Sequence, residues 1–549
     1  MSKTSRWPTL GELFEKSAQA FPDKPFLSTY VGSDKKTLSY KQARVQSRRW
    51  ATLFISLGIR PGQSVALRGK NSPSWVLAFL GCVQAGAVVV PLDAQISDAD
   101  AVKLSVAGEC RLFVHDSESS GVVPLLEGIP AVSFDTELPQ EQEIEVATEA
   151  HETAAILFTS GTTGHPKGVM LTHENFTSDC LLAQQLLSIS TDDVFYALLP
   201  LHHAYTLLAV FLEAVSVGAS LLFAEKLAVS AVLSDLKRGG VTMFLAVPLL
   251  FNKLLDGLLQ AVKKKGFFVW LSLRALMKLS GMVKKTIGHN PGRKWFRSVL
   301  EQAGLASLRV CISGGGPLAP QVFRRLNELG LDFVQGYGLT ETSPILALNP
   351  VVKYKETSVG RILPGVEARL RNMDAQGQGE LVVKGPMVMK GYFRDPEATA
   401  EVLQDGWLRT GDVGRLDDDN YLYLTGRVKS LIVSEGGKNV YPEEIEYAFQ
   451  IHAEIEQILV RGWLKNAEKR TEGIEALIYP NPESVRLWAQ GKNADEAQTA
   501  IHEAVSSIVA QVNRTLLPYQ KIDRFTLLET PLEMTTTRKV RRLATDSQP

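Results

Sequence analysis

Hydrophobic and polar positions along the first half of the chain follow a repeating order. From Thr37 to about Leu250, amphipathic stretches are followed by short runs of β-branched residues, as in 74-SWVLAFLGCVQAG-86 before 87-AVVVPL-92. Helices that end at Gly and precede Val-rich strands are typical of parallel α/β layers. We therefore predict buried parallel sheets with helices on their faces.

The pattern changes in the second half. Residues 251–304 form a helical, basic and aromatic interruption, and the apolar runs of 308–318 and 332–344 then lead into Gly-rich loops. From Val366 the chain shows short alternating strands such as 421-YLYLTGR-427. This alternation predicts a smaller, antiparallel sheet.

The last part of the chain begins a new unit. The stretch 430-SLIVSEGGKNVYPEEIEYAF-449 predicts a strand, a Gly-Gly turn and a helix that starts at Pro442, because Pro is favoured in the first helical turn. We predict an α/β protein with a large N-terminal domain, residues 1–427, in which layered sheets are flanked by helices. Residues 428–549 form a small, mobile C-terminal α+β lobe.

Composition narrows the range of partners. The 549 residues contain 59 basic and 59 acidic side chains, so there is no global charge that would attract nucleic acid. The four cysteines have neither disulfide nor zinc-site spacing, and the first 25 residues have no signal-peptide pattern. These features predict a cytoplasmic protein that does not bind nucleic acid.

Two apolar segments could be mistaken for membrane spans. Leu207–Ala224 contains Glu213, and Phe267–Leu273 is about a third of the roughly 20 residues that a span needs. We expect both to be buried core or interface. The segment 262-VKKKGFFVWLSLRALMKL-279 has aromatics beside a lysine cluster, which predicts either peripheral contact with anionic lipid or an amphipathic helix docked on the protein.

The most informative local sequence is 159-TSGTTGHPKG-168, which follows an apolar run. Backbone N–H groups of a loop of small residues, with the hydroxyls of Thr and Ser, form a cradle for phosphate oxygens, and Lys167 adds a positive charge. The cradle comprises Thr159, Ser160, Gly161, Thr162, Thr163 and Gly164. A P-loop is excluded because Pro166 stands where that motif needs Gly and Gly168 follows the Lys.

This loop resembles the signature of the adenylate-forming enzymes, the superfamily of acyl-CoA synthetases, luciferases and peptide-synthetase adenylation domains. Further matching motifs follow in the same order along nearly the whole chain. They are 83-VQAGAVVVPLD-93, 199-LPLHHAY-205, 313-SGGGPL-318, 336-GYGLTETSP-344, 410-TGDVGRL-416, 426-GRVKSLIVSEGGKNVYPEEIE-446 and 533-EMTTTRKVRR-542. Such a collinear series is highly specific.

The resemblance implies a nucleotide site. Tyr337, between glycines that include Gly338, would lie against adenine, Thr340 would donate to the α-phosphate, and Glu341 would bind magnesium. Asp412, after a Gly at a turn, would accept the ribose hydroxyls, with Arg427 as a second ribose contact. The resemblance also places Gly314, Gly315 and Gly316 at the nucleotide site, and Thr163 beside Glu341 at the metal.

Three further roles follow from the resemblance. His203 would line the site at the acyl carboxylate. Lys539 aligns with the mobile catalytic lysine, which must reach the reacting carboxylate and α-phosphate in one domain orientation and leave in another. Lys429 matches the hinge, and the Gly436-Gly437 turn would approach the thiol arm after rotation. Arg538 stands where most members carry Gly, and this tail resembles the long-chain fatty-acid branch, which usually has Pro where Thr536 stands.

These parts together imply two half-reactions. A fatty acid and ATP, with Mg²⁺, give acyl-AMP and pyrophosphate, and the thiol of coenzyme A then attacks the acyl-AMP. An acyl carrier protein as acceptor, or a medium-chain or aryl acid as substrate, stays open. A peptide-synthetase module is disfavoured because no carrier domain is visible. A binding protein without catalysis is disfavoured because Glu341, Asp412, Arg427 and Lys539 are all present.

Overall fold

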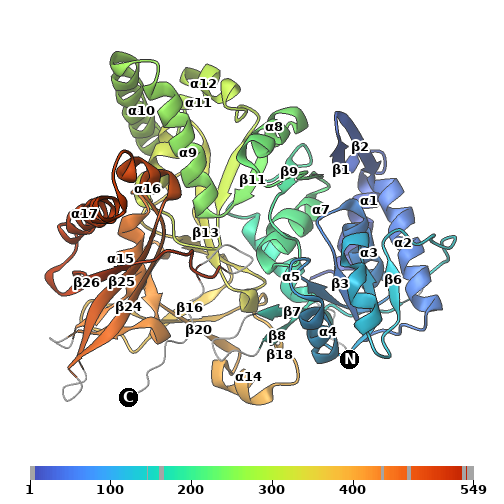
Figure 1. Cartoon of the computed structure of the whole chain (residues 1–549). Coiled ribbons are helices and arrows are strands. Elements are labelled where there is room, and N and C mark those ends of the chain that lie inside the picture. Colours follow the sequence, from blue (N-terminus) through green and yellow to red (C-terminus); the bar gives the residue numbers. More distant parts are fainter. Residues whose placement is uncertain are drawn as a thin grey trace.

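The computed structural model describes residues 7–144, 146–159, 166–434, 438–466, 471–534 and 540. Figure 1 shows a large domain, coloured blue through yellow to light orange, and a smaller C-terminal domain, coloured deeper orange to red. Within the described ranges, every helix is either too short or too polar to cross a lipid bilayer.

The first sheet of the large domain has 14 strands, in the order β16-β17-β20-β21-β15-β14-β13-β12-β11-β9-β10-β1-β2, with β19 beside β20. In the run β13-β12-β11-β9-β10-β1, each strand pairs in parallel with the next. The strands are β1 (Pro25–Val31), β2 (Asp34–Ser39), β9 (Val194–Ala197), β10 (Ser220–Phe223), β11 (Met243–Ala246), β12 (Val310–Ser313), β13 (Asp332–Gly338), β14 (Ile345–Leu348), β15 (Gly360–Ile362), β16 (Glu367–Arg371), β17 (Gly379–Lys384), β19 (Leu403–Gln404), β20 (Trp407–Leu416) and β21 (Tyr421–Arg427).

The antiparallel part corrects one expectation. Strands β14 to β21 pair antiparallel as predicted. They do not form a separate small sheet, because β14 pairs with β13 and continues the large parallel sheet. The nucleotide motifs at the end of β13 and on β20 therefore belong to one sheet.

The second sheet has seven strands, in the order β18-β8-β7-β4-β3-β5-β6. Its core strands are buried on both faces: Val65 and Leu67 face one apolar cluster and Ala66 faces another. Such burial is expected of a parallel sheet that is covered on both sides. The strands are β3 (Ser64–Arg68), β4 (Val88–Leu92), β5 (Cys110–His115), β6 (Ala131–Ser133), β7 (Thr153–Thr159), β8 (Lys167–Thr172) and β18 (Gly391–Tyr392).

Helices lie between the two sheets and on their outer faces. Between the sheets, α3 contacts β3 and β4 on one side and β1 on the other, and α5 contacts β8 and β14. These inner helices are α1 (Leu10–Ala20), α2 (Tyr40–Ser56), α3 (Pro73–Gln84), α5 (His173–Ala183) and the continuous series α6 (Ala204–Thr206), η2 (Leu207–Leu212) and α7 (Glu213–Val217). The segment from Leu207 is buried core as predicted.

Other helices cover the outer faces of the two sheets, and the segment 251–304 adds further helices at the periphery. Helix α4 (Asp98–Ala107) contacts β4 and β5, η1 (Ser117–Leu125) follows it, and α13 (Pro320–Glu328) contacts β13. The segment 251–304 is helical as predicted and contacts α13. The remaining outer helices are α8 (Val229–Gly239), α9 (Pro248–Lys263), α10 (Phe267–Ile287), α11 (Gly292–Trp295), α12 (Arg297–Gln302) and α14 (Pro396–Val402). The short helix η3 (Thr340–Thr342) follows β13 and contacts β8.

Local sequence explains the ends of several helices. Thr9 and Glu12 form a capping box at α1, and Ser39 and Gln42 do the same at α2. Helix α8 ends at Gly240, whose φ of +62° is the left-handed conformation that favours glycine. The predicted handover from a Gly-terminated helix to a buried strand is thus confirmed at α8 and β11.

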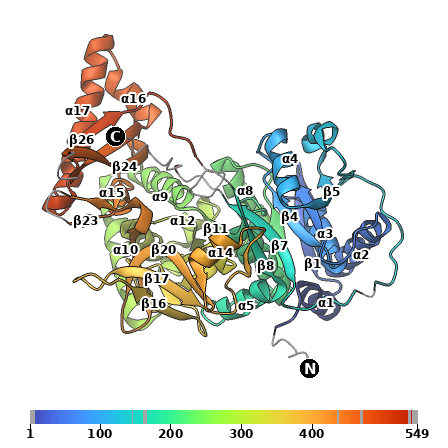
Figure 2. The same cartoon turned by 90° about the horizontal axis from the view of Figure 1, so that it is seen from below.

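The C-terminal domain has its own apolar core, which includes Ile432, Val460, Ile478 and Val509. In Figure 2 it projects from one side of the large domain. As predicted, a helix begins at Pro442, after a short hairpin. The boundary at 427/428 stays a prediction. The elements are η4 (Val428–Ser430), β22 (Ile432–Val433), β23 (Asn439–Val440), α15 (Pro442–Phe449), β24 (Ile455–Asn466), β25 (Thr471–Pro480), α16 (Pro482–Ala489), α17 (Ala494–Asn513), η5 (Pro518–Gln520) and β26 (Arg524–Leu527).

Candidate active site

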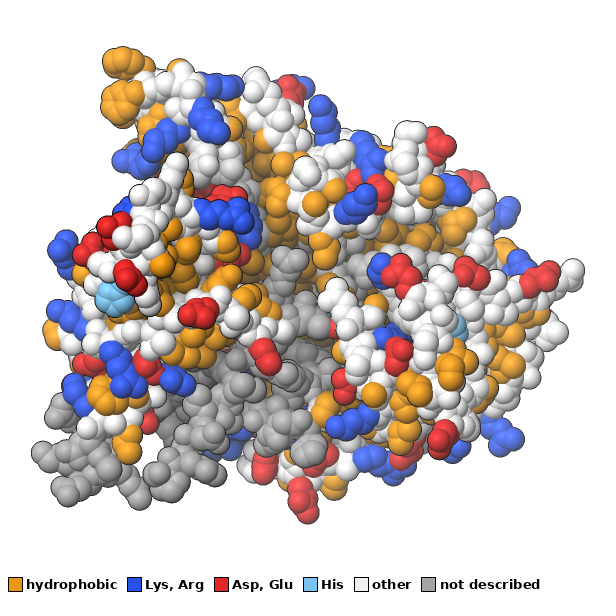
Figure 3. All heavy atoms as spheres, viewed as in Figure 1, with side chains coloured by type: hydrophobic (Ala, Val, Ile, Leu, Met, Phe, Trp, Pro, Cys, Tyr) orange, Lys and Arg blue, Asp and Glu red, His pale blue; other side chains and the backbone are white. Residues whose placement is uncertain are grey.

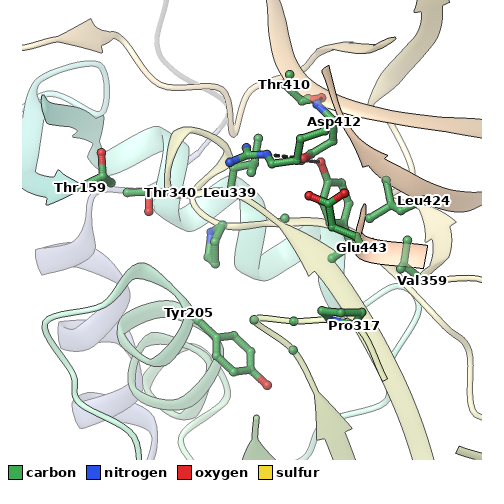
Figure 4. A pocket seen from close by; sticks show the side chains of 18 of the residues that line it. Thr159, Tyr205, Pro317, Leu339, Thr340, Val359, Thr410, Asp412, Leu424 and Glu443 are labelled. Carbon is green, nitrogen blue, oxygen red and sulfur yellow. Dashed lines mark hydrogen bonds and ion pairs between the residues drawn. The ribbon is translucent and has the colours of Figure 1, made fainter. Parts of the chain in front are cut away.

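A cleft of about 3360 Å³ lies where the large domain meets the C-terminal domain. Figure 4 shows Thr159, Thr340, Asp412 and Glu443 around one space, although they come from distant parts of the chain. Among the described residues, the structure brings the predicted site residues together here. They are Thr159, Lys167, His203, Gly314, Gly315, Gly316, Tyr337, Gly338, Thr340, Glu341, Asp412, Arg427 and Lys429.

Asp412 is held at the cleft by two partners. Its Oδ1 accepts a hydrogen bond from Nε of Arg427 at 2.8 Å, and its Oδ2 accepts one from the hydroxyl of Tyr337 at 2.5 Å. Burial and the Asp412 carboxylate together raise the pKa of Tyr337, so this hydroxyl stays protonated and donates. Each carboxylate oxygen has further lone pairs that can accept from a ligand hydroxyl.

The location of Asp412 corrects the sequence interpretation in one respect. We expected it at a turn, because Gly411 precedes it. Asp412 instead lies inside β20, opposite Arg427 in β21. Gly411 has a φ of +70°, which bends the strand locally without ending it. The cross-strand register therefore fixes the Asp412–Arg427 ion pair.

Glu341 lies in η3, directly after β13, and the structure gives it a partner that the sequence did not indicate. The hydroxyl of Tyr392 donates to Oε1 of Glu341 at 2.9 Å. The ammonium of Lys167 lies 4.9 Å from the centre of the Tyr392 ring. Tyr392 thus connects the predicted metal ligand with the end of the predicted phosphate loop.

No local pattern marks Tyr392 as a site residue. It stands 51 positions after Glu341 in the chain. Its place is set by β18, which pairs with β8 so that Tyr392 is opposite Val169. Only the pairing of these distant strands could have identified it.

The ends of the predicted phosphate loop are described, although its middle is not. Strands β7 and β8 pair antiparallel, and Thr159 is opposite Lys167. The loop therefore joins two antiparallel strands, whereas a P-loop joins a strand to a helix. This topology agrees with the rejection of a P-loop from the sequence.

Two glycines are required by close packing at the cleft. A Cβ on Gly338 would collide with the carbonyl group of Pro344. A Cβ on Gly314 would lie within 3.0 Å of three atoms of the Tyr205 ring. Larger residues would force either the wall after β13 or Tyr205 to move.

The histidine pair differs in environment. His203 lines the cleft as predicted and stands at the start of α6. Nε2 of His202 lies 3.8 Å from Oδ2 of Asp93, which is too far for a hydrogen bond. Burial lowers the pKa of His202 to about 3. His202 is therefore neutral near pH 7.

The C-terminal domain contacts the cleft through α15 and the residue after it. Nε2 of Gln450 donates to the carbonyl of Pro317 at 2.9 Å, and Oε1 of Gln450 accepts from the N–H of Ala319 at 2.9 Å. The hydroxyl of Tyr447 donates to the carbonyl of Leu318. These contacts hold the small domain against the loop that follows β12. Sequence reasoning did not find them.

Several predicted site residues lie outside the described part of the chain. They are Ser160, Gly161, Thr162, Thr163 and Gly164 of the phosphate loop, Gly436 and Gly437 of the small-domain turn, and Lys539 of the C-terminal tail. Among the described residues, no group of three or more His, Cys, Asp or Glu side chains could hold a metal ion.

Comparison with known proteins gives the same family along most of the chain. Residues 14–393 match the family described as AMP-binding enzyme. A feruloyl-CoA synthase of Amycolatopsis sp is 31% identical over 449 residues, which cover 79% of this chain and 82% of that protein. A long-chain-fatty-acid–CoA ligase of Bacillus subtilis (strain 168) is 28% identical over 511 residues, covering 83% and 82%.

Solved structures share the fold. The o-succinylbenzoate CoA synthetase of Bacillus subtilis, in complex with the acyl-adenylate intermediate OSB-AMP, superposes with a TM-score of 0.75. The two sequences are 25% identical, and the match covers 98% of each chain. The relatives differ in the acid that their names specify.

Proposed function

The chain belongs to the AMP-binding enzyme family, and from this premise we propose that it activates a fatty acid with ATP and transfers the acyl group to coenzyme A. Activity as an AMP-forming acid–CoA ligase is common to the named relatives. The observation that carries the proposal is the convergence of Glu341, Asp412 and His203 on one cleft. The fatty-acid substrate rests on the resemblance of the C-terminal tail, 533-EMTTTRKVRR-542, to the long-chain fatty-acid branch.

In the first half-reaction, an oxygen of the acid carboxylate attacks the α-phosphorus of ATP, a P–O bond forms, and pyrophosphate leaves. Two anions approach each other, so the site must offset negative charge. In our proposal Thr340 donates to the α-phosphate, and Lys539 supplies a cation to the same region. Thr159 and Lys167 flank the loop that would hold the outgoing phosphates.

Mg²⁺, when bound, would neutralise phosphate charge. Glu341 fits the role of a protein ligand to Mg²⁺, because its carboxylate lines the cleft and the hydroxyl of Tyr392 orients it. Thr163 would be the second protein contact. Asp412, already fixed by Arg427, would accept from the ribose hydroxyls, and Tyr337 lies beside it, where adenine would stack.

In the second half-reaction, the thiolate of coenzyme A attacks the acyl carbonyl, a C–S bond forms, and AMP leaves with the former carboxylate oxygen. Lys539 must withdraw for the pantetheine arm to enter. We propose that the small domain rotates about Lys429 and that the Gly436-Gly437 turn then lines the path of the arm.

Pyrophosphate release across straight-chain acids from C2 to C20, together with aromatic acids, tests the substrate proposal. Each reaction would contain coenzyme A or an acyl carrier protein. We expect the highest kcat/KM with a fatty acid and coenzyme A. Preference for an aromatic acid, or for the carrier protein, would replace the fatty-acid and coenzyme A parts of the proposal by those alternatives.

A further inference from the structure

A buried carboxyl group, Glu213, lines the cleft together with many apolar residues, and the buried carboxyl group of Asp179 lies near it. The residue surface of Glu213 is only 2% exposed. It stands where the π-helical segment η2 changes to α7, and π-helical turns are frequent at functional sites. Apolar residues that also line the cleft include Leu187, Phe195, Ala209, Met243 and Ile345.

The hydrogen bonds of Glu213 are incomplete. Its Oε2 accepts from Nε2 of Gln184 at 2.7 Å. Its Oε1 is buried and has no hydrogen-bond partner among the described residues. The hydroxyl of Ser216 donates to the main-chain carbonyl of Glu213 at 2.8 Å and lies 3.5 Å from Oε2. A buried polar atom without a hydrogen-bond partner is destabilising, so a ligand that supplied the missing hydrogen bond would be stabilised at this position.

The surroundings keep this carboxyl group protonated. Burial raises the pKa of Glu213 to about 8. Asp179 is also buried, and its Oδ2 accepts from the N–H of Ile345 at 2.7 Å, which fixes the neighbouring wall. No lysine or arginine is among the hydrogen-bond or ion-pair partners of Glu213 in the described chain. A neutral carboxyl group suits a neutral donor or acceptor such as a hydroxyl.

We propose that Glu213 binds a hydroxyl group at the far end of the acyl substrate, an inference that rests on the proposed function. Thr206, Ala209 and Glu213 line the cleft along the helical series that begins beside His203. Ten residues of helix span about 15 Å. An acid whose carboxylate lies at His203 and whose hydroxyl reaches Glu213 would therefore have a chain of roughly a dozen carbons, given C–C bonds of about 1.5 Å.

Two matched pairs of acids test this role: dodecanoate with 12-hydroxydodecanoate, and cinnamate with 4-hydroxycinnamate. We expect wild type to prefer 12-hydroxydodecanoate over dodecanoate by about 10-fold or more in kcat/KM, whereas 4-hydroxycinnamate, which is too short to reach Glu213, should show no such preference over cinnamate. Glu213→Leu should remove that preference by lowering kcat/KM for the hydroxylated acid and raising it for the plain acid. Glu213→Gln, which keeps hydrogen bonding, should retain much of it.

The outcomes separate this inference from the proposed function. If wild type and Glu213→Leu give the same ratio with the dodecanoate pair, the role of Glu213 is contradicted while the ligase function stands. If no acid in the C2–C20 and aromatic panel supports pyrophosphate release, the proposed function itself fails. Thermal unfolding shows whether both variants fold. If Glu213→Leu does not fold, the ratio of kcat/KM values measured with Glu213→Gln is compared with that of wild type instead.

A second, independent observation concerns α10. Its inner face packs on the domain through Leu273 and Met277. At about 100° per residue, Phe268 and Met282 point to the opposite side, and Phe267 lies at the flank between the two sides. Phe267 is 69% exposed and Phe268 is 81% exposed, and Figure 3 shows apolar side chains projecting at the end of the molecule where Figure 1 places α10. Of the two expectations for this stretch, buried core or interface, these exposures exclude buried core for Phe267 and Phe268.

The charge of this segment is one-sided. Between Asp256 and Glu301 the sequence has ten Lys or Arg residues and no Asp or Glu, although the whole chain is balanced. Lys263, Lys264 and Lys265 are exposed directly before Phe267. Two carboxylates of neighbouring elements also lie beside α10: Glu356 is 3.8 Å from the Lys285 ammonium, and Glu328 lies beside Gly281. The apolar end at Phe267 and Phe268, which follows the three exposed lysines, is complementary to an anionic lipid surface.

We propose that the outward face of α10 docks the protein on anionic lipid. Sedimentation of the full chain with phosphatidylcholine vesicles, with or without phosphatidylglycerol, measures this. We expect binding at low salt only with the anionic vesicles. It should weaken at least fivefold in high salt, after the joint change of Lys263, Lys264 and Lys265 to Gln, and after Phe267→Ser with Phe268→Ser.

A matched control is Leu487→Ser in α16, because Leu487 is also 69% exposed and lies in the other domain. That variant should bind as wild type does. Absence of binding to anionic vesicles at low salt would contradict the proposal. A second result would also contradict it: no vesicle binding, together with a concentration-dependent dimer that Phe267→Ser with Phe268→Ser abolishes. The outward face of α10 would then bind a second copy of the chain.

Discussion

The hydroxyl of Tyr392 donates to the Glu341 carboxylate at 2.9 Å, and the same ring lies under the Lys167 ammonium. This relationship connects the candidate metal ligand with the end of the candidate phosphate loop. A tyrosine donor holds the carboxylate in one rotamer without neutralising it. Loss of the Tyr392 hydroxyl should therefore weaken the use of Mg²⁺ and ATP and leave the binding of the acid substrate unchanged.

Tyr392→Phe should lower kcat/KM for ATP about 10- to 100-fold, which is the usual effect of removing a group that orients a metal ligand. Raising the Mg²⁺ concentration should restore part of the activity. Initial rates over a Mg²⁺ titration measure this. Tyr423→Phe is the control, because Tyr423 donates to Asp417 at the same 2.9 Å but does not line the cleft. Equal Mg²⁺ dependence in both variants would remove the role of Tyr392.

Lys539→Ala should lower the rate of adenylation by about 10²–10³, since the loss of one transition-state charge or donor has that effect. The fold should be unchanged, because Lys539 lies near the end of the chain. Pyrophosphate release and thermal unfolding give the two readouts. Lys521→Ala, an exposed cation of the same domain, should keep full activity. A Lys539→Ala rate within tenfold of wild type would refute the assignment.

The rotation of the small domain predicts different losses for two variants. Lys429→Pro fixes φ at the proposed hinge, so it should impair at least one half-reaction. Gly437→Leu should spare acyl-AMP formation and block thioester formation, because a side chain would fill the path of the thiol arm. Each half-reaction is measured separately for each variant. Equal losses in both half-reactions for Gly437→Leu would leave the rotation without support.

Contacts of the small domain give a further test of rotation. Gln450→Ala removes two hydrogen bonds to the loop after β12, one with Pro317 and one with Ala319. If the domain must leave this position in one half-reaction, the variant should change the two half-reaction rates by different factors, by about threefold or more. The same factor for both rates would indicate a general loss of stability.

Stability should fall below about pH 6.5 because His202 and His173 are buried and neutral. Burial lowers the pKa of His202 to about 3 and that of His173 to about 4. Below pH 6.5 the unfolded chain binds protons that the folded chain does not, so the folded state loses about 2 kcal/mol per histidine between pH 7 and pH 5. The unfolding temperature of His202→Gln should drop less over this range than that of wild type. An equal drop would contradict a neutral His202.

The layered part of the fold could be predicted because its information is local. Residues such as Val65, Ala66 and Leu67 are apolar in succession, as expected when both faces of a strand are covered. The continuity of the large sheet could not be predicted, because it depends on pairing of β13 with β14. That pairing is decided by packing after the chain has folded.

The candidate site divides in the same way. Asp412 and Glu341 stood in recognisable motifs, so their convergence on one cleft was expected. Tyr392 and the anchors on α15 have no motif, and only tertiary contacts show them. Glu213 could be noticed in sequence as a charge within an apolar run, but its unpaired Oε1 at the cleft required the structure.

The central claim is that one cleft joins an acid to AMP before coenzyme A takes part. Acid-dependent exchange of labelled pyrophosphate into ATP, measured without coenzyme A, tests it most directly. The account predicts exchange that requires both the acid and Mg²⁺, followed, when coenzyme A is added, by equal amounts of AMP and acyl-CoA. Exchange that needs coenzyme A from the start, or ADP and phosphate as the products, would contradict it.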